Sequence, residues 1–312
     1  MTLPVFARVS FFRQYLPKLL IVIGLTAGCC ALGSGCRFAA TPTEGETPKP
    51  CRILSHTLAT DEILLELVPV DRIVGVTNLV DDPEISSVPG RYPAHIPRLR
   101  EADAERMIGL TPDLVCVAPY NSIDFIHLLE NSGLSIYRNE AVNSIDEVEA
   151  GILVLGERVG EPKRARELAA KMKQRRDRIT ERLKGVPERP RVLFWSAGYT
   201  AGPISTIDDL IREAGATNVA AELGLGASAE ISPERMVAAD PDYVLLCRWA
   251  GDDRPNQVEN HPILRRLRAV QTNRVLSIEG HYLTSVSQYV VEGVERLARL
   301  LHPERFAIEA AP

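Results

Sequence analysis

Asp103-Ala-Glu-Arg-Met-Ile-Gly-Leu-Thr-Pro-Asp-Leu-Val-Cys-Val117 returns 129 positions later as Ser232-Pro-Glu-Arg-Met-Val-Ala-Ala-Asp-Pro-Asp-Tyr-Val-Leu-Leu246. The two stretches align without a gap, and their identical pairs include Glu105 with Glu234 and Asp113 with Asp242. Each stretch predicts a short capped helix, a Pro-Asp turn and then a buried strand. A unit of this kind that occurs twice indicates two lobes of one architecture.

On either side of the repeat, short apolar runs alternate with helical patterns. This alternation predicts an α/β fold with a central parallel sheet in each half. In the first half we expect strands at 52–55, 72–77, 114–118 and 134–137, and helices at about 60–68, 103–110 and 122–132. In the second half we expect strands at 191–195, 243–248 and 274–278, and helices that begin at Thr206 and Ser232 or cover 261–267 and 285–301.

The middle of the chain predicts helix rather than a loose linker. Ser144-Ile-Asp-Glu147 is a capping box, and positions 145, 148, 152, 155 and 159 put apolar residues on one helical face. Pro162 can begin a second helix that runs to about residue 183. We therefore expect an N-terminal lobe at 51–142, a bridging helix region at 143–189 and a C-terminal lobe at 190–308.

The first 36 residues read as an export leader. Arg8, Arg13 and Lys18 precede the apolar run Leu19–Gly28, and small residues then lead to Cys29 and Cys36. Such an end resembles a bacterial lipoprotein signal, in which one of these cysteines receives the lipid; ordinary secretion and an uncleaved anchor are the alternatives. Residues 37–50 are rich in Pro and Thr and predict a flexible tether. We expect an exported protein, held by lipid at the membrane on its periplasmic or extracytoplasmic side.

Composition excludes several classes of protein. The 312 residues are 45% apolar and 25% charged with a net charge of −5, which argues against a disordered chain and against a general nucleic-acid binder. Beyond the leader only Cys51, Cys116 and Cys247 remain, without a C-x-x-C spacing. We therefore expect neither a zinc knuckle nor a disulfide framework, and we expect Cys116 and Cys247 to be buried in strands.

In parallel sheets of this type, ligands bind in loops beyond the carboxyl ends of the strands. Aromatic residues, one arginine and two histidines in these loops suit a bulky planar or anionic metal complex. Trp195 could equally belong to the core, His56 could ligate a bound metal centre or cap the next helix, and Arg248 could form a surface salt bridge. The candidate ligand contacts are His56, Thr57, Tyr120, Trp195, Tyr199, Arg248, Trp249, His281 and Tyr282.

Glu105 and Glu234 occupy the same place in the two copies of the repeat, in the first turn of a helix. An acidic residue there complements the helix dipole, which is a sufficient structural reason for its presence. The functional alternative is a pair of exposed carboxylates, one from each lobe, presented to basic sockets on a partner.

Together these segments resemble the substrate-binding proteins of ABC importers for iron complexes and vitamin B12. The resemblance implies two Rossmann-like lobes bridged by a long helix, and a receptor without catalytic activity or cofactor. It implies that the protein captures an iron chelate or a corrinoid as a monomer, and that Glu105 and Glu234 dock onto arginines of the membrane permease. The segments that carry the resemblance are Ala59–Leu67 with Arg72–Val76, Glu105–Val115, Asp209–Asn218, Ser232–Val244 and Leu301–Glu304.

The loop at 55–60 departs from the family pattern, because it lacks the proline often found there and has His56 where an apolar residue is usual. Two other functions stay open. A receptor for bare zinc or manganese could recruit His56, His127 and His281, although His127 lies within a predicted helix. An exported α/β hydrolase is the second, although the chain contains neither H-E-x-x-H nor G-x-S-x-G.

Overall fold

The computed structural model describes residues 49–139, 142–249 and 254–307. Every helix and strand described here belongs to the compact unit Pro50–Pro312. The predicted leader with Cys29 and Cys36, and residues 37–48 of the predicted tether, lie outside the described residues. The predicted boundaries between lobes and bridge stay predictions.

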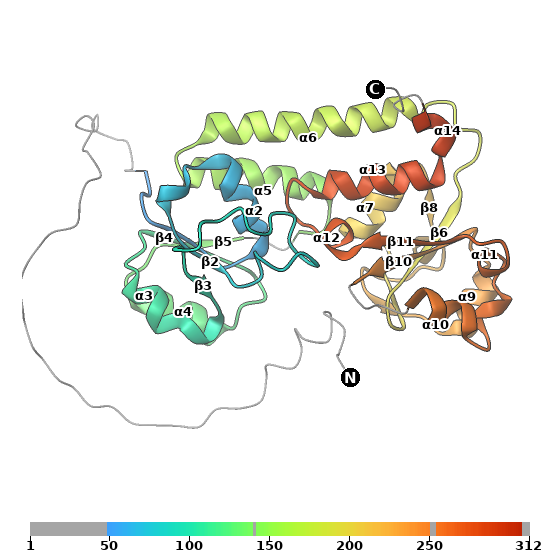
Figure 1. The fold of residues 1–312 in the computed structure, drawn as a ribbon, viewed down its shortest axis with the longest axis horizontal. Helices are drawn as coiled ribbons and strands as arrows, with labels where there is room; N and C mark the ends of the chain where they lie inside the picture. Colours follow the sequence, from blue (N-terminus) through green and yellow to red (C-terminus); the bar gives the residue numbers. More distant parts are fainter. Residues whose placement is uncertain (1–48, 140–141, 250–253, 308–312) are drawn as a thin grey trace, which may run out of the picture. The chain divides into compact units, whose positions relative to one another are not determined.

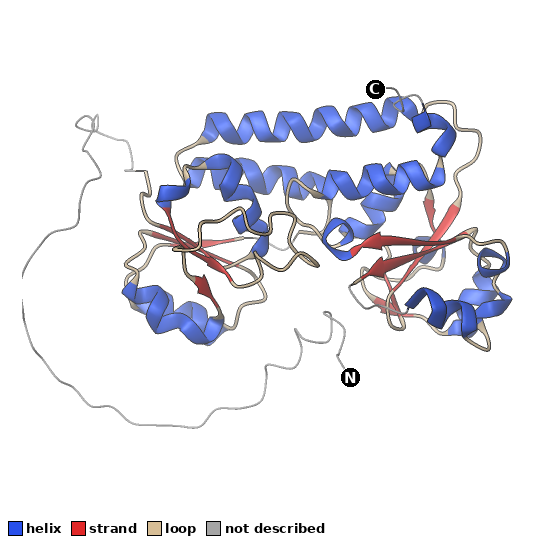
Figure 2. Ribbon diagram, viewed as in Figure 1, coloured by secondary structure: helices blue, strands red, loops and turns tan. Residues whose placement is uncertain are grey.

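The N-terminal lobe contains a five-stranded sheet in the order β3-β2-β1-β4-β5, and all of its strand pairs are parallel (Figures 1 and 2). The short 3₁₀ helices η2 (Val70–Arg72) and η3 (Glu101–Asp103) precede β2 and α3. The strands are β1 (Ile53–Ser55), β2 (Ile73–Thr77), β3 (Arg98–Leu99), β4 (Leu114–Val117) and β5 (Ile136–Arg138), and the helices are α2 (Leu58–Leu67), α3 (Ala104–Gly109) and α4 (Ile123–Asn131).

The C-terminal lobe contains a four-stranded parallel sheet in the order β11-β10-β6-β8, and β7 (Tyr199–Thr200) pairs antiparallel with β9 (Ala229–Glu230) beside it. Its strands are β6 (Arg191–Trp195), β8 (Thr217–Asn218), β10 (Tyr243–Arg248) and β11 (Val275–Glu279). Its helices are α7 (Thr206–Glu213), α8 (Val219–Glu222), α9 (Pro233–Ala239), α10 (Arg254–Asn260), η4 (Leu264–Arg266), α11 (Arg268–Gln271), α12 (Gly280–Leu283), α13 (Val290–Leu301) and α14 (Pro303–Phe306).

Two packed helices connect the sheets, α5 (Ile145–Arg158) and α6 (Pro162–Arg182). All five apolar positions predicted to share a face of this region are buried. The 21-residue α6 packs against α2 of the first lobe and against α7 and α13 of the second, and Figure 1 shows it running alongside both. The predicted α/β fold of two parallel-sheet lobes bridged by a long helix is confirmed.

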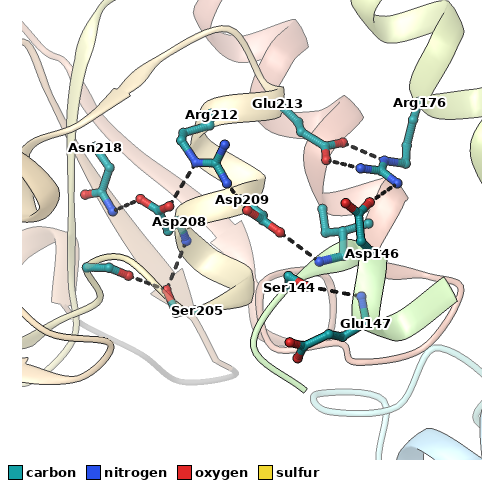
Figure 3. Close-up of polar contacts among 12 residues, drawn as sticks. Ser144, Asp146, Glu147, Arg176, Ser205, Asp208, Asp209, Arg212, Glu213 and Asn218 are labelled. Carbon is teal, nitrogen blue, oxygen red and sulfur yellow. Dashed lines mark hydrogen bonds and ion pairs between the residues drawn. The ribbon is translucent and has the colours of Figure 1, made fainter. Parts of the chain in front are cut away.

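Ion pairs fix the bridge to the second lobe (Figure 3). Arg176 pairs with Glu213 of α7 and with Asp146 of α5, at 2.5 Å and 2.8 Å. The carboxylate of Asp209 accepts the backbone N–H of Ile145 at 2.8 Å, so α7 also holds the first turn of α5. Because Arg176 and Glu213 are both largely withdrawn from solvent, their ion pair is screened less than a surface pair, whereas Asp146 is 81% exposed.

The repeated segment plays the same structural part in each lobe. The Asp113 carboxylate accepts the backbone N–H of Arg52 at 3.0 Å, and that of Asp242 accepts the N–H of Arg191 at 2.8 Å. The two arginine side chains then donate to carbonyl groups at or just beyond the ends of α3 and α9. The Pro-Asp pair thus fixes the start of the neighbouring strand in both sheets.

Several predicted helix ends are wrong. The helix expected at 261–267 is reduced to the 3₁₀ helix η4 at 264–266, because α10 ends at Asn260 and His261 Nδ1 then accepts the N–H groups of Ile263 and Leu264. The closing helix begins at Val290 rather than at Ser285, since the hydroxyl of Ser285 accepts the N–H of Ser287 in a turn. No helix in the described ranges has both the length and the apolar character needed to cross a bilayer.

Candidate ligand-binding site

The loops at the carboxyl ends of the two sheets meet. The hydroxyl of Ser287, in the segment between β11 and α13, donates to the carboxylate of Glu62 in α2. The Gln288 side-chain amide donates to the backbone carbonyl of Glu62 at 2.9 Å, and Arg91 donates to the hydroxyl of Tyr289 at 3.0 Å. The two carboxyl edges, where ligands of such sheets bind, therefore face one another.

A cavity of about 270 Å³ lies at this junction. The loop that follows β2 forms one side of the cavity. Residues of α12, the first turn of α13 and the residue before α13 form the other side. Two predicted ligand contacts, His281 and Tyr282, belong to its lining. The full lining is Pro83, Ser86, Ser87, Pro89, His281, Tyr282, Tyr289 and Glu292.

His281 and Tyr282 form the aromatic wall of this cavity. Their ring centroids are 4.0 Å apart, and the Arg296 guanidinium lies 3.8 Å from the centroid of the Tyr282 ring and donates to its hydroxyl at 2.7 Å. The Nδ1 atom of His281 is buried and has no hydrogen-bond partner among the described residues. Burial lowers the pKa of His281, which favours the neutral imidazole, a form able to ligate a metal.

Arg248 is engaged at the end of β10. Its guanidinium pairs with the carboxylate of Glu279, whose second oxygen lies 3.8 Å from Arg296. Burial alone would raise the pKa of Glu279, but its own backbone N–H and the two arginines outweigh that and hold the pKa below its usual value. Because Arg248 is half-exposed, this pair leaves part of the guanidinium open to an anionic group.

The two tryptophans have different surroundings. Trp249 packs so closely on Gly280 that a Cβ atom at position 280 would lie 2.2 Å from Cζ3 of the indole. Trp195 packs against the apolar cluster around Leu193, and its Nε1 is buried without a hydrogen-bond partner in the described part of the chain. Tyr199 is 46% exposed, and its hydroxyl donates to Glu230 at 3.0 Å.

In the first lobe, His56 is buried against the ring of Phe125, with centroids 5.0 Å apart, and the pKa of His56 is lowered by that burial. The alternative in which His56 caps the next helix is wrong, because the cap is Thr57, whose hydroxyl accepts the Thr60 N–H at 3.0 Å. Tyr120, by contrast, is 64% exposed, in the loop that follows β4.

Asp61 lies fully buried one turn into α2. Its carboxylate accepts the hydroxyl of Thr77 at 2.5 Å and the backbone N–H of the same residue at 3.2 Å. Burial raises the pKa of Asp61 to about 7. This contact ties the end of β2, where the cavity loop begins, to the helix that carries Glu62.

Glu105 and Glu234 are both exposed, in the first turns of α3 and α9. Neither makes an ion pair or a side-chain hydrogen bond with any other described residue. Within the described ranges, no three His, Cys, Asp or Glu side chains converge in a group that could hold a metal ion.

The model of the family described as "Periplasmic binding protein" matches residues 53–282. The chain belongs to this family. Its members are binding proteins, and the matched region contains both parallel sheets and the helices that bridge them. The unmatched residues that follow include α13 and α14, so the periplasmic binding protein match ends at the aromatic wall of the cavity.

Two relatives of this periplasmic binding protein are similar over most of its length. A cobalamin-binding protein of Halobacterium salinarum is 28% identical over 269 residues, which is 81% of this chain and 70% of the relative. An uncharacterized ABC transporter substrate-binding lipoprotein of Bacillus subtilis is 25% identical over 272 residues, 83% of this chain and 82% of the relative.

Solved structures share the fold. A possible iron-binding periplasmic solute-binding protein of Staphylococcus epidermidis matches with a TM-score of 0.72 and 21% identity, over 82% of this chain and all of the other. A periplasmic haem-binding protein of Roseiflexus matches with a TM-score of 0.68 and 22% identity, over 81% of this chain and 98% of the other.

Six of the cavity residues do not appear among the predicted contacts. Four of them lie in the segment 81–97, which the sequence marks only as rich in proline, and two lie beyond Tyr282 in a stretch expected to be helical. The useful signal was the position of the proline-rich segment directly after a strand, since such loops carry binding residues on a rigid scaffold. These residues are Pro83, Ser86, Ser87, Pro89, Tyr289 and Glu292.

Proposed function

We propose that this protein is an extracytoplasmic receptor that captures a corrinoid and delivers it to an ABC importer. The observation that carries the proposal is the meeting of the two carboxyl edges, where His281 and Tyr282 line a cavity of about 270 Å³ that can receive one edge of so large a ligand. The cobalamin-binding relative, similar over 81% of this chain, favours a corrinoid over haem or a ferric siderophore. The proposed activity is stoichiometric binding without chemistry on the ligand.

The side chains around the junction suit such a ligand. Tyr282 with Arg296 offers a polarised aromatic face, and the half-exposed Arg248 offers positive charge. Tyr120 and Tyr199 add exposed aromatic surface after strands of the two sheets. A corrinoid combines an extended ring system with amide and phosphate groups, so it can use all of these features.

We further propose that Glu105 and Glu234 dock the loaded receptor onto the permease. Both carboxylates are exposed and make no ion pair or side-chain hydrogen bond with the described residues, and their matching places in the repeat would present one charge from each lobe. A lipid on Cys29 or Cys36 would hold the receptor, as a monomer, near that partner. The substrate-binding lipoprotein of Bacillus subtilis is consistent with such an anchor.

The test is a titration of the compact unit from Pro50 onward, followed by tryptophan fluorescence with correction for absorption by the ligand. Cyanocobalamin, haemin, ferrichrome and Zn²⁺ are compared. Saturable quenching at one equivalent of cyanocobalamin supports the proposal. Binding of haemin or ferrichrome alone overturns the corrinoid assignment, and tight binding of Zn²⁺ alone overturns the chelate receptor.

His281→Ala and Tyr282→Ala examine whether the cavity is the site. Each should weaken binding of cyanocobalamin about tenfold or more if it contacts the ligand. His127→Ala is the matched control, because His127 lies on the exposed face of α4. Equal affinity in all three variants would place the ligand elsewhere.

A further inference from the structure

Ile204 combines two unfavourable properties at one position. It is the most exposed of the large apolar side chains described, at 73%, and its backbone lies in the left-handed region with φ 64°. A β-branched residue is a true outlier in that region, because its Cβ substituents crowd the backbone. Glycine would remove both the strain and the exposure.

The surrounding turn holds Ile204 in this conformation. Gly202 donates its N–H to the carbonyl of Gly226 at 2.9 Å, and the Ser205 hydroxyl donates to the carbonyl of Gly202 at 2.7 Å while it caps α7. Figure 3 shows Ser205 and Asp208 in that cap, and Asn218 in hydrogen-bond contact with Asp208. Strain that persists because its neighbours determine it is typical of functional positions.

The topology places Ile204 at the ligand-binding edge. It lies in the segment between the carboxyl end of β6 and the start of α7, and the carboxyl edges of the two sheets face each other. Other strongly exposed apolar side chains occupy the same kind of place, since Leu79 follows β2 and both Tyr120 and Ile123 follow β4. Tyr199, like Ile204, follows β6. The ten exposed large apolar side chains of the described residues therefore include five that lie between the end of β2, β4 or β6 and the first turn of the next long helix.

We infer that Ile204 is a ligand contact of the second lobe, held exposed so that it packs against an apolar face of the bound molecule. This inference rests on the proposed function and narrows it. The cargo must present an apolar surface to the second lobe, as the rim of a corrin ring does, rather than a uniformly hydrophilic shell.

The test compares Ile204→Gly with Thr111→Gly. Thr111 is also β-branched, exposed and left-handed, with φ 47°, but it precedes β4 and therefore lies at the opposite, amino edge of its sheet. Relief of strain offsets the extra freedom of glycine in the unfolded chain, so the melting temperature should not fall in either variant. Affinity for cyanocobalamin, measured by calorimetry, should fall about tenfold in Ile204→Gly alone.

Ile204→Val keeps the branched apolar side chain and should retain wild-type affinity within about threefold. The heat-capacity change of binding should be less negative in Ile204→Gly, because less apolar surface is buried. Equal affinity in the two glycine variants overturns the inference and leaves the receptor function standing. Failure of the wild-type protein to bind cyanocobalamin overturns the proposed corrinoid function and this inference with it.

Discussion

The carboxylate of Glu62 accepts a hydrogen bond from the hydroxyl of Ser287, 225 residues further along the chain. Glu62 is 2% exposed, and its other carboxylate oxygen accepts the backbone N–H of Ser87 at 2.7 Å. Burial raises the pKa of Glu62, and the bonds from Ser287 and Ser87 oppose that rise. One buried side chain thus connects the loop of the first lobe to the segment that leads into α13.

Ser287→Ala should destabilise the protein by about 1–3 kcal/mol, because it leaves a buried acceptor without its partner. Urea unfolding measures the loss, and a double-mutant cycle with Glu62→Gln isolates the energy of the pair. Asp177→Asn is the control, since the pair of Asp177 with Lys173 is 63–64% exposed and should contribute less than about 1 kcal/mol. A Ser287→Ala loss no larger than that of the control would contradict a structural role for this contact.

The buried Asp61 should make stability depend on pH. Its folded pKa of about 7 lies above the ordinary value of 3.8, so the folded state binds the proton more tightly than the unfolded state does. Its contribution is therefore complete below about pH 4 and is lost as the pH rises towards 7. Asp61→Asn removes this dependence. The free energy of unfolding of the variant minus that of the wild type should therefore rise by about 2–3 kcal/mol between pH 5 and pH 8. Parallel stability curves for the two proteins would refute the assignment.

Gly280→Ala should disturb the indole of Trp249. The new Cβ would lie 2.2 Å from the ring, so the ring must move at a cost of about 1–3 kcal/mol. Thermal unfolding and the tryptophan emission spectrum report stability and ring position. Gly151→Ala is the matched control, because a Cβ there meets nothing within 4 Å inside α5 and should stabilise the helix by about 0.5–1 kcal/mol. An unchanged spectrum in Gly280→Ala would show that the contact is not tight.

Charge reversal of Glu105 and Glu234 to arginine should abolish uptake of the cargo while affinity stays within about twofold of wild type. Each change also places a positive charge at the N-terminus of a helix, which should lower the free energy of unfolding by only about 0.3–1 kcal/mol. Uptake by cells and binding by the purified protein are measured on the same variants. Reversal of the exposed Glu167 on α6 serves as control and should leave uptake unchanged. Lost affinity in the double variant would refute the docking role.

Sequence patterns predicted the long strands better than the short ones. Both β6 and β10 have the predicted bounds, because their apolar runs of four and five residues, 192–195 and 243–247, are flanked by polar or turn residues. The two-residue strands β3, β7, β8 and β9 exist only through pairing with distant segments, such as that of Arg98 with Val76, and have no periodicity of their own. The turn at Ser285 was missed for the same reason, since its neighbour Ser287 bonds to Glu62 in the other lobe.

The candidate site was predictable only in outline. The rule that ligands lie beyond the carboxyl ends of strands led to His281 and Tyr282, which line the cavity. The proline-rich segment after β2 was visible in the sequence, but the sequence did not show that Ser87 in it, or Tyr289 in the second lobe, lines the cavity, because that depends on how the two lobes meet. Nothing in the sequence marked Ile204 as a ligand contact, because an apolar residue between Pro203 and Ser205 is ordinary. Its left-handed backbone and its exposure became visible only in the structure.

Gly156 of α5 faces Ala165 of α6 so closely that a Cβ atom on the glycine would lie 2.2 Å from that of the alanine. Two rods in such contact cannot slide or rotate past each other without a clash, and α6 alone extends about 30 Å at 1.5 Å per residue. We therefore expect the bridge to behave as one rigid body and to hold the two lobes at nearly constant spacing. A permease that binds Glu105 and Glu234 would then find the same distance between the two carboxylates on an empty receptor as on a loaded one. Empty receptors would then compete with full ones for the importer, unless residues at the mouth of the cavity report the cargo directly.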